Sequence, residues 1–210
     1  MKMLARFRGD ETGAAMVEMT IAIVLLLTLT LGFVDLGNAY YQWNAATKAV
    51  QAGARMASIS NPIVAAISQA GPIAVPGGAI PAGSYDYVCD GSTSACACTG
   101  ASCVNGAWVA ANFNRIYAGD DGTCGPVAGN RPGMCDFYPF LQPGNVVVRY
   151  TATGLGYQTR PNGSIPTITV SLQNVNFQFF FLSGLLGFSN ITMPAMLSTV
   201  TGEDMRSTAP

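Results

Sequence analysis

Residues 14–36 read AAMVEMTIAIVLLLTLTLGFVDL, and this stretch decides the fold. No residue from Met19 to Val34 is charged, and Glu18 is the one charged residue in the 21 positions that end at Val34. A helix of about 20 apolar residues spans the hydrocarbon core of a bilayer. The stretch therefore predicts a single transmembrane helix over residues 14–36.

The residues before this helix predict its orientation. Lys2, Arg6 and Arg8 precede the apolar run, and basic flanks stay on the cytoplasmic side. We therefore expect a cytoplasmic N-terminus and an exported chain after the helix. A cleaved secretory signal peptide is the alternative, but the run is too long for one and no small-x-small cleavage site follows closely.

The helical pattern continues beyond the membrane, because no proline or turn cluster intervenes before Asn61-Pro62. A helix over residues 14–58 would be about 68 Å long, so its outer part, residues 37–60, must protrude and find packing partners. A ridge of small residues supports such packing, since another backbone can approach it closely. Its members recur every four residues: Ala45, Ala49, Gly53 and Ala57. The alternative is that alanine is simply common in helices.

Glu18 is the most informative residue, because a carboxylate inside a transmembrane helix is costly and usually has a partner. If a peptidase cut between Gly13 and Ala14, Glu18 would be the fifth residue of the mature chain, one helical turn from the new amine. That ammonium group and the carboxylate of a neighbouring subunit could neutralise each other. Alternatively, Glu18 lies near the lipid headgroups and reaches water.

A short basic leader, a glycine and an apolar helix with glutamate at its fifth position resemble the type IV prepilins. More narrowly, residues 13–57 resemble the TadE-like family of the tight-adherence (Flp) pilus system. The matching segments are GAAMVEM at 13–19, DLG at 35–37 and AVQAGARMA at 49–57. The chain departs from the family pattern in two ways. It has Met19 where the family often has an aromatic residue, and it lacks the proline that the family often carries early in the apolar run. Residues 35–40 lean toward the related TadG-like pattern.

The resemblance implies that residues 1–13 are a cytoplasmic leader, removed by a prepilin peptidase between Gly13 and Ala14, and that Glu18 serves assembly. It also implies a bacterial inner-membrane protein, incorporated in a pilus or in its assembly machine. The implied partners are other pilins and minor pilins, the inner-membrane assembly platform and membrane lipid. A long helix followed by a small antiparallel sheet is the fold that a resemblance to pilins implies.

The sequence of the exported region, residues 61–210, predicts such a sheet independently of the resemblance. Residues 61–107 are rich in glycine, proline and other turn formers, with a short helix possible in 61–69. An amphipathic helix is expected over residues 107–118. Alternating apolar and polar residues predict strands at 146–153 and 167–173, a break near Asn174 and a last, edge strand in 191–201, which contains Pro194. The fold class is therefore α+β.

Residues 177–188, FQFFFLSGLLGF, form the most apolar stretch of the exported region. They are too few to span a membrane. The simpler interpretation is a buried strand and turn packed under the sheet. The alternative is an exposed patch that meets a neighbouring subunit or the membrane surface.

The six cysteines predict three disulfides in an oxidising compartment. They are Cys89, Cys96, Cys98, Cys103, Cys124 and Cys135. The favoured single pair is Cys124–Cys135, which flanks a glycine- and proline-rich loop. Cys96 and Cys98 are too close to pair without strain, so each is expected to pair elsewhere. No C-x-x-C pair and no histidine occur, which argues against a zinc site.

The composition disfavours several function classes. The net charge is −1 without a basic surplus, so no nucleic-acid partner is expected. The chain has no histidine, which removes the commonest general base, and Asp120-Asp121-Gly122 lacks calcium-loop spacing. We expect no cofactor, no metal and no enzyme, but a minor pilin or pseudopilin. A membrane-tethered adhesive or ligand-binding domain outside any pilus is the alternative.

Overall fold

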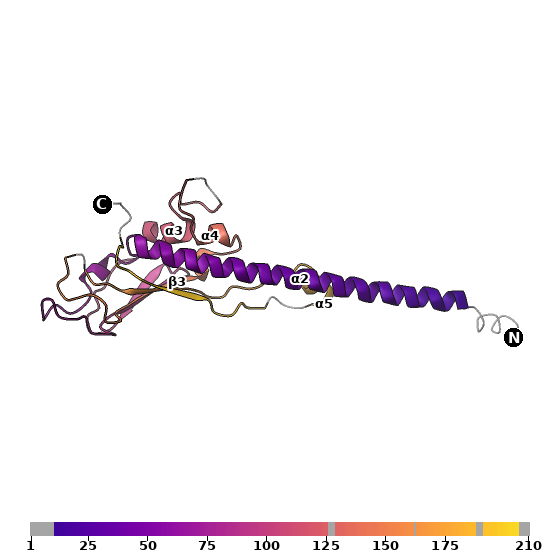
Figure 1. Cartoon of the computed structure of the whole chain (residues 1–210), viewed down its shortest axis with the longest axis horizontal. Helices are drawn as coiled ribbons and strands as arrows, with labels where there is room; N and C mark the ends of the chain where they lie inside the picture. Colours follow the sequence, from indigo (N-terminus) through magenta and orange to yellow (C-terminus); the bar gives the residue numbers. More distant parts are fainter. Residues whose placement is uncertain (1–10, 126–128, 162, 188–190, 206–210) are drawn as a thin grey trace. The chain divides into compact units, whose positions relative to one another are not determined.

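The computed structural model describes residues 11–125, 129–161, 163–187 and 191–205 (Figure 1). It divides into two compact units. The helix unit comprises Met1–Tyr41 and Phe177–Ile191, and the sheet unit comprises Gln42–Asn176 and Thr192–Pro210. One helix, α2 (Glu11–Ile59), supplies residues to both, which confirms the single long helix expected from the sequence.

The sheet unit is built on five antiparallel strands in the order β2-β1-β3-β4-β5. Their bounds are β1 Asp86–Asp90, β2 Ala95–Thr99, β3 Val146–Thr151, β4 Thr167–Leu172 and β5 Leu197–Thr201. The α+β class with a small antiparallel sheet is thereby confirmed. β5 is an edge strand that begins only after Pro194, because proline cannot donate a ladder hydrogen bond.

Alternation along β3 and β4 produces the core face of the sheet. Val148 pairs with Val170, and Tyr150 pairs with Ile168; all four side chains are buried. The hydroxyl group of Tyr150 accepts a hydrogen bond from the backbone N–H of Ile63 at 3.2 Å. Burial raises the pKa of this phenol further above physiological pH. β4 stops before Asn174, whose φ of +54° breaks the strand where the pattern predicts it.

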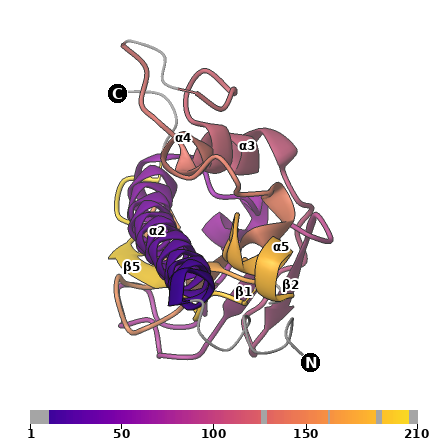
Figure 2. The same ribbon diagram turned by 90° about the vertical axis from the view of Figure 1, so that its right-hand side faces the viewer.

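Short helices complete the sheet unit. They are η1 Ala65–Gln69, α3 Ala110–Ala118, α4 Met134–Phe137 and η2 Pro143–Asn145. The part of α2 in this unit lies between the sheet and the pair α3 and α4 (Figures 1 and 2). α3 begins at Ala110 and not at residue 107, because Trp108 forms a β-bridge with Val64 and stays extended.

One expectation for residues 61–107 needs correction. The segment contains the β1–β2 hairpin, where only loops and a short helix were expected. A strand pattern is hard to see there because β2 reads ACACT and has little apolar surface to bury. Covalent bonds replace that burial: Cys89 lies opposite Cys96 in the ladder, and the two form a disulfide.

All six cysteines are in disulfides, as expected. The pairs are Cys89–Cys96, Cys98–Cys103 and Cys124–Cys135. The last is the pair favoured from the sequence. It ties the loop after α3 to α4, where Cys135 is buried.

Removing the Cys124–Cys135 bond should lower stability and expose thiols in a defined pattern. We expect Cys124→Ser and Cys135→Ser each to release one titratable thiol, and the double variant to release none. Loop constraint by such a bond contributes about 2–4 kcal/mol, so all three variants should unfold at lower denaturant by similar amounts. Six free thiols in the unreduced wild-type protein would contradict the arrangement.

Gly53 is required by close packing against α4. A Cβ atom at this position would lie 2.5 Å from Sδ and 2.7 Å from Cγ of Met134, which is fully buried and has little room to move. We therefore expect Gly53→Ala to lower the melting temperature, although alanine favours helices by about 1 kcal/mol over glycine. In a Met134→Ala background the same substitution should raise it.

The matched control is Gly37→Ala, because no neighbouring atom lies within 4 Å of a Cβ built there. It should be neutral or stabilising. An equal effect of Gly53→Ala in both backgrounds, measured by thermal unfolding of the full chain in detergent, would show that Met134 does not set the requirement.

Candidate functional site

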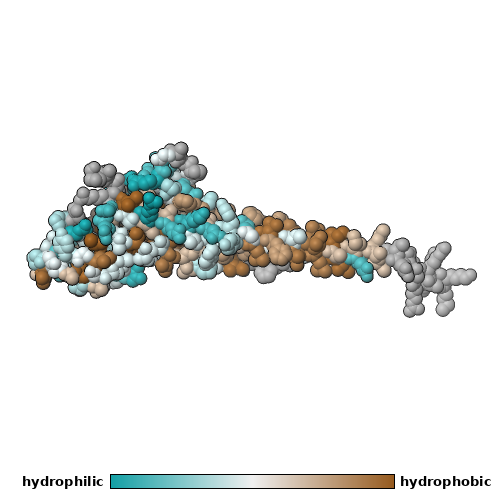
Figure 3. Space-filling model, viewed as in Figure 1, coloured by the Kyte–Doolittle hydropathy of each residue, from teal (hydrophilic) through white to brown (hydrophobic). Residues whose placement is uncertain are grey.

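The N-terminal part of α2 carries a continuous apolar surface. From Met16 to Val34 most large apolar side chains are exposed, and the face in Figure 3 shows hydrophobic residues along this part of the helix. Within the described chain, one helical segment, Gly13–Ile59, is long and apolar enough to cross a membrane. Its window of highest hydropathy is not buried by the protein, unlike a core helix. This segment can therefore serve as a membrane anchor.

The predicted processing site and Glu18 lie on this surface. Gly13 and Ala14 are exposed near the start of α2, and Glu18 is exposed on the same helix. Val17 and Met19 beside it are exposed as well. An ion pair between Glu18 and an amine at Ala14 of a neighbour would need a second subunit. The role of these residues thus stays a prediction.

Asp35 is a site residue that the sequence analysis missed. Its side chain is 0% exposed, and its carboxylate accepts three backbone hydrogen bonds. The donors are the N–H groups of Phe180, Phe181 and Leu182, at 3.0, 2.8 and 2.6 Å. The sequence does contain an indication of this role, because a carboxylate at the end of an apolar run is costly without a partner. Nothing in the sequence shows that the partner lies about 145 residues away.

We call residues 177–187 the aromatic hook. Besides Asp35, the Nδ2 amide of Asn38 holds it by donating to the carbonyl oxygen of Gln178 at 3.0 Å. The hook contains helix α5 (Leu182–Leu186) and belongs to the helix unit. Phe180 is 64% exposed and Phe181 is 40% exposed. The simpler expectation of a strand buried under the sheet is therefore wrong; residues 188–190 lie outside the described chain.

The small-residue ridge of α2 lies in the sheet unit, and its four members are buried there. Met134 of α4 packs against Gly53, and Thr47 donates a hydrogen bond to the sulfur of Met196 at 3.6 Å. The small side chains thus let the protein's own segments approach this part of the helix.

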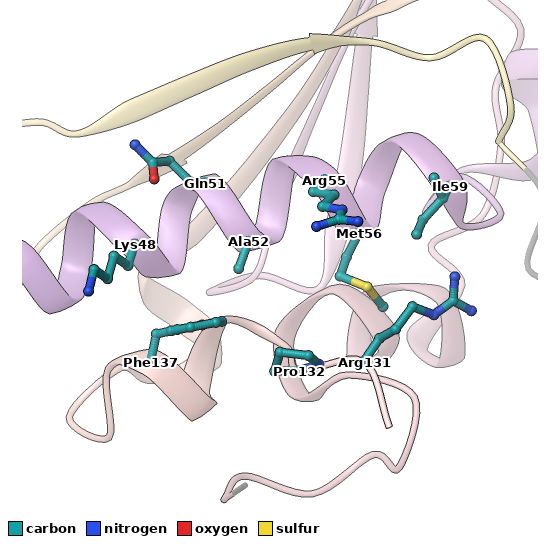
Figure 4. A pocket seen from close by; sticks show the side chains of 9 residues that line it. All are labelled: Lys48, Gln51, Ala52, Arg55, Met56, Ile59, Arg131, Pro132 and Phe137. Carbon is teal, nitrogen blue, oxygen red and sulfur yellow. The ribbon is translucent and has the colours of Figure 1, made fainter. Parts of the chain in front are cut away.

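A groove of about 360 Å³ opens between α2 and the segment that carries α4 (Figure 4). Three of its lining side chains are basic, namely Lys48, Arg55 and Arg131, and none is acidic. Met56 and Phe137 provide apolar surface. The lining thus combines positive charge with apolar surface.

Asp120 neutralises part of the positive charge near this groove. Arg131 Nε lies 2.6 Å and Arg115 Nη2 lies 2.7 Å from its carboxylate oxygens. Burial by itself would raise the pKa of Asp120, but hydrogen bonds from Arg131 and Arg115 and their charges outweigh it and lower that pKa. Asp121 accepts the N–H of Thr123 at 3.0 Å in an exposed turn. Across the described residues, no three His, Cys, Asp or Glu side chains gather as metal ligands would.

Comparison with known proteins adds one result. A family model described as TadE-like protein matches residues 13–55. No curated protein and no solved structure matches the chain. The match covers the apolar surface, Glu18, Asp35 and most of the small-residue ridge, and it supports an association with the tight-adherence pilus system. The resemblance expected from the sequence is thereby confirmed: residues 13–55 match the TadE-like family, and the rest of the chain lies outside the match.

Proposed function

We propose that the protein is a structural or assembly subunit of a tight-adherence type IV pilus, as a minor pilin or pseudopilin, and not an enzyme. One observation carries this proposal. The TadE-like segment coincides with a helix that is apolar and exposed before Tyr41 and packed within the sheet unit after it. A helix of this kind both anchors a subunit in lipid and displays a folded domain.

The exposed part of α2 suits assembly as well as anchoring. Leucine and isoleucine side chains cover it, and neighbouring apolar helices can replace lipid around them without exposing them to water. In our proposal, the subunit exchanges lipid for such helices when it joins a filament. In our proposal the N-terminus is cytoplasmic, residues after 36 are exported, and a prepilin peptidase removes residues 1–13.

The partners follow from the same arrangement. Other pilins and minor pilins would pack on the apolar helix, while the inner-membrane assembly platform would act on the anchored subunit. Surface attachment would depend on the exported domain. The absence of histidine from the sequence supports a structural role over acid–base catalysis.

Glu18→Ala should separate insertion from assembly. The run from Met19 to Val34 is sufficient for insertion, so we expect this variant to enter the membrane and to be cut normally. Losing one partner of a buried ion pair typically costs about 3–5 kcal/mol, so it should no longer co-purify with the major pilin. Glu18→Asp, which keeps the charge on a shorter side chain, should be intermediate.

The readouts are the mass of the mature chain and its co-purification with the pilus. A mature chain that begins at Ala14 would support processing. Normal incorporation of Glu18→Ala would leave this residue as one that merely reaches the headgroups. Correct processing without any pilus association of the wild-type protein would favour the tethered adhesive domain instead.

Topology can be measured directly in spheroplasts. Because Lys2, Arg6 and Arg8 resist transfer, protease added outside should cut the chain after Ser60 and leave its N-terminal end protected. The control is digestion after the membrane has been dissolved, which should expose both ends. Protection of the region after Ser60, with an accessible N-terminal end, would reverse the proposed orientation.

A further inference from the structure

The aromatic hook is held at one position along the axis of α2. Asp35 binds three consecutive N–H groups of the hook, and Asn38, one helical turn further on, binds the carbonyl group of Gln178. Leu182 also reaches α2: its Cδ2 atom lies 4.0 Å from a Cβ built on Gly32. The N–H of Phe177 donates to the carbonyl oxygen of Ile191 at 2.9 Å and closes the base of the hook.

This position along α2 corresponds to the outer boundary of the proposed membrane span. The 21 residues from Ala14 to Val34 make a helix about 31 Å long, close to the thickness of a hydrocarbon core. Asp35 is the next residue and lies at the outer end of the proposed span, residues 14–36. Since its oxygens lie 3.0 Å or less from the hook's backbone, the hook must lie at the same boundary.

The side chains at this height are those that membrane interfaces favour. Phe180 and Phe181 are exposed on the hook, Phe33 is exposed on α2 just before Asp35, and Tyr40 and Tyr41 are exposed shortly after it. Aromatic rings are enriched where acyl chains meet headgroups. The hook thus widens, with two further rings, the apolar surface that the helix already presents at this level.

We propose that the aromatic hook is a second membrane contact, which inserts Phe180 and Phe181 into the acyl-chain and headgroup boundary of the outer leaflet beside α2. This inference rests on the proposed membrane anchoring. The Asp35 carboxylate makes insertion possible, because it satisfies three backbone N–H groups that would be costly to leave unpaired near lipid. No residue of the hook is charged, so insertion does not require anionic lipid.

A neighbouring subunit is the other surface that two exposed phenylalanines could meet. Lipid is favoured by position, because hydrogen bonds within one chain already place the rings at the level of the bilayer boundary. The surface is also continuous with the exposed apolar helix, which lipid would cover in the same anchored state.

The test uses the full chain in phosphatidylcholine vesicles with a single fluorescent reporter. Trp43→Phe and Trp108→Phe remove the native tryptophans, and Phe180→Trp supplies the reporter. Lipids brominated near the top of the acyl chain should quench its emission more strongly than lipids brominated near the chain end. Equal emission with and without brominated lipid would overturn the proposal.

Two matched reporters separate this result from the anchoring itself. Phe33→Trp, on the exposed helix, should be quenched whenever the protein spans the bilayer, and Ile73→Trp, exposed in the sheet unit, should not. Quenching at position 33 without quenching at 180 would overturn the hook and leave the anchor. No quenching at position 33 would overturn the anchor, and the hook with it. Emission at position 180 that responds to the protein-to-lipid ratio and not to bromine would assign the rings to a second copy and overturn the lipid contact.

Substitution of Asp35 tests whether its carboxylate positions the hook. With the reporter at 180, Asp35→Ala should abolish most of the shallow quenching and shift emission to the red, while Asp35→Asn, which keeps one acceptor oxygen, should lose less. Quenching at position 33 should stay unchanged in both variants, which controls for folding and insertion. Undiminished quenching at 180 in Asp35→Ala would show that the carboxylate does not hold the hook at the boundary.

Discussion

The structure depends on one continuous helix whose surroundings differ along its length. Before Tyr41 most large side chains of α2 are apolar and exposed, and such a surface is unstable in water and requires lipid or other apolar helices. After Gln42 the helix presents small residues to its own sheet unit, where Ala46 and Ala49 are fully buried. A single secondary structure element thus joins a segment that lacks an internal core to a unit that has one.

Asp35 lies near the change between these surroundings. A carboxylate there would be costly if it were desolvated without partners, and the three N–H groups of the hook provide them. In return, one helical side chain positions a segment that is distant in sequence. The interaction therefore gives the helix unit a tertiary contact of its own, although none of its described residues belongs to a strand of the sheet.

Local patterns carried most of what could be predicted. The apolar run sets the helix, strict alternation sets β3 and β4, and the loop between Cys124 and Cys135 indicates their bond. The β1–β2 hairpin was missed because disulfides, and not an apolar face, support it. The Asp35–hook contact was missed for a different reason, since no periodicity relates residues so far apart in the chain.

Because the small-residue ridge is buried within the chain, it is not available for contacts with a neighbouring subunit. Close approach along Ala45, Ala49 and Gly53 is already used by the protein's own sheet unit, with Met134 in contact with Gly53. A neighbouring helix cannot occupy the same surface without displacing that packing. Under the proposed function, contacts between the α2 helices of neighbouring subunits would therefore use the exposed stretch before Tyr41. Glu18 lies in that stretch, where a second subunit can reach it, whereas the buried ridge packs its part of α2 against the rest of the sheet unit.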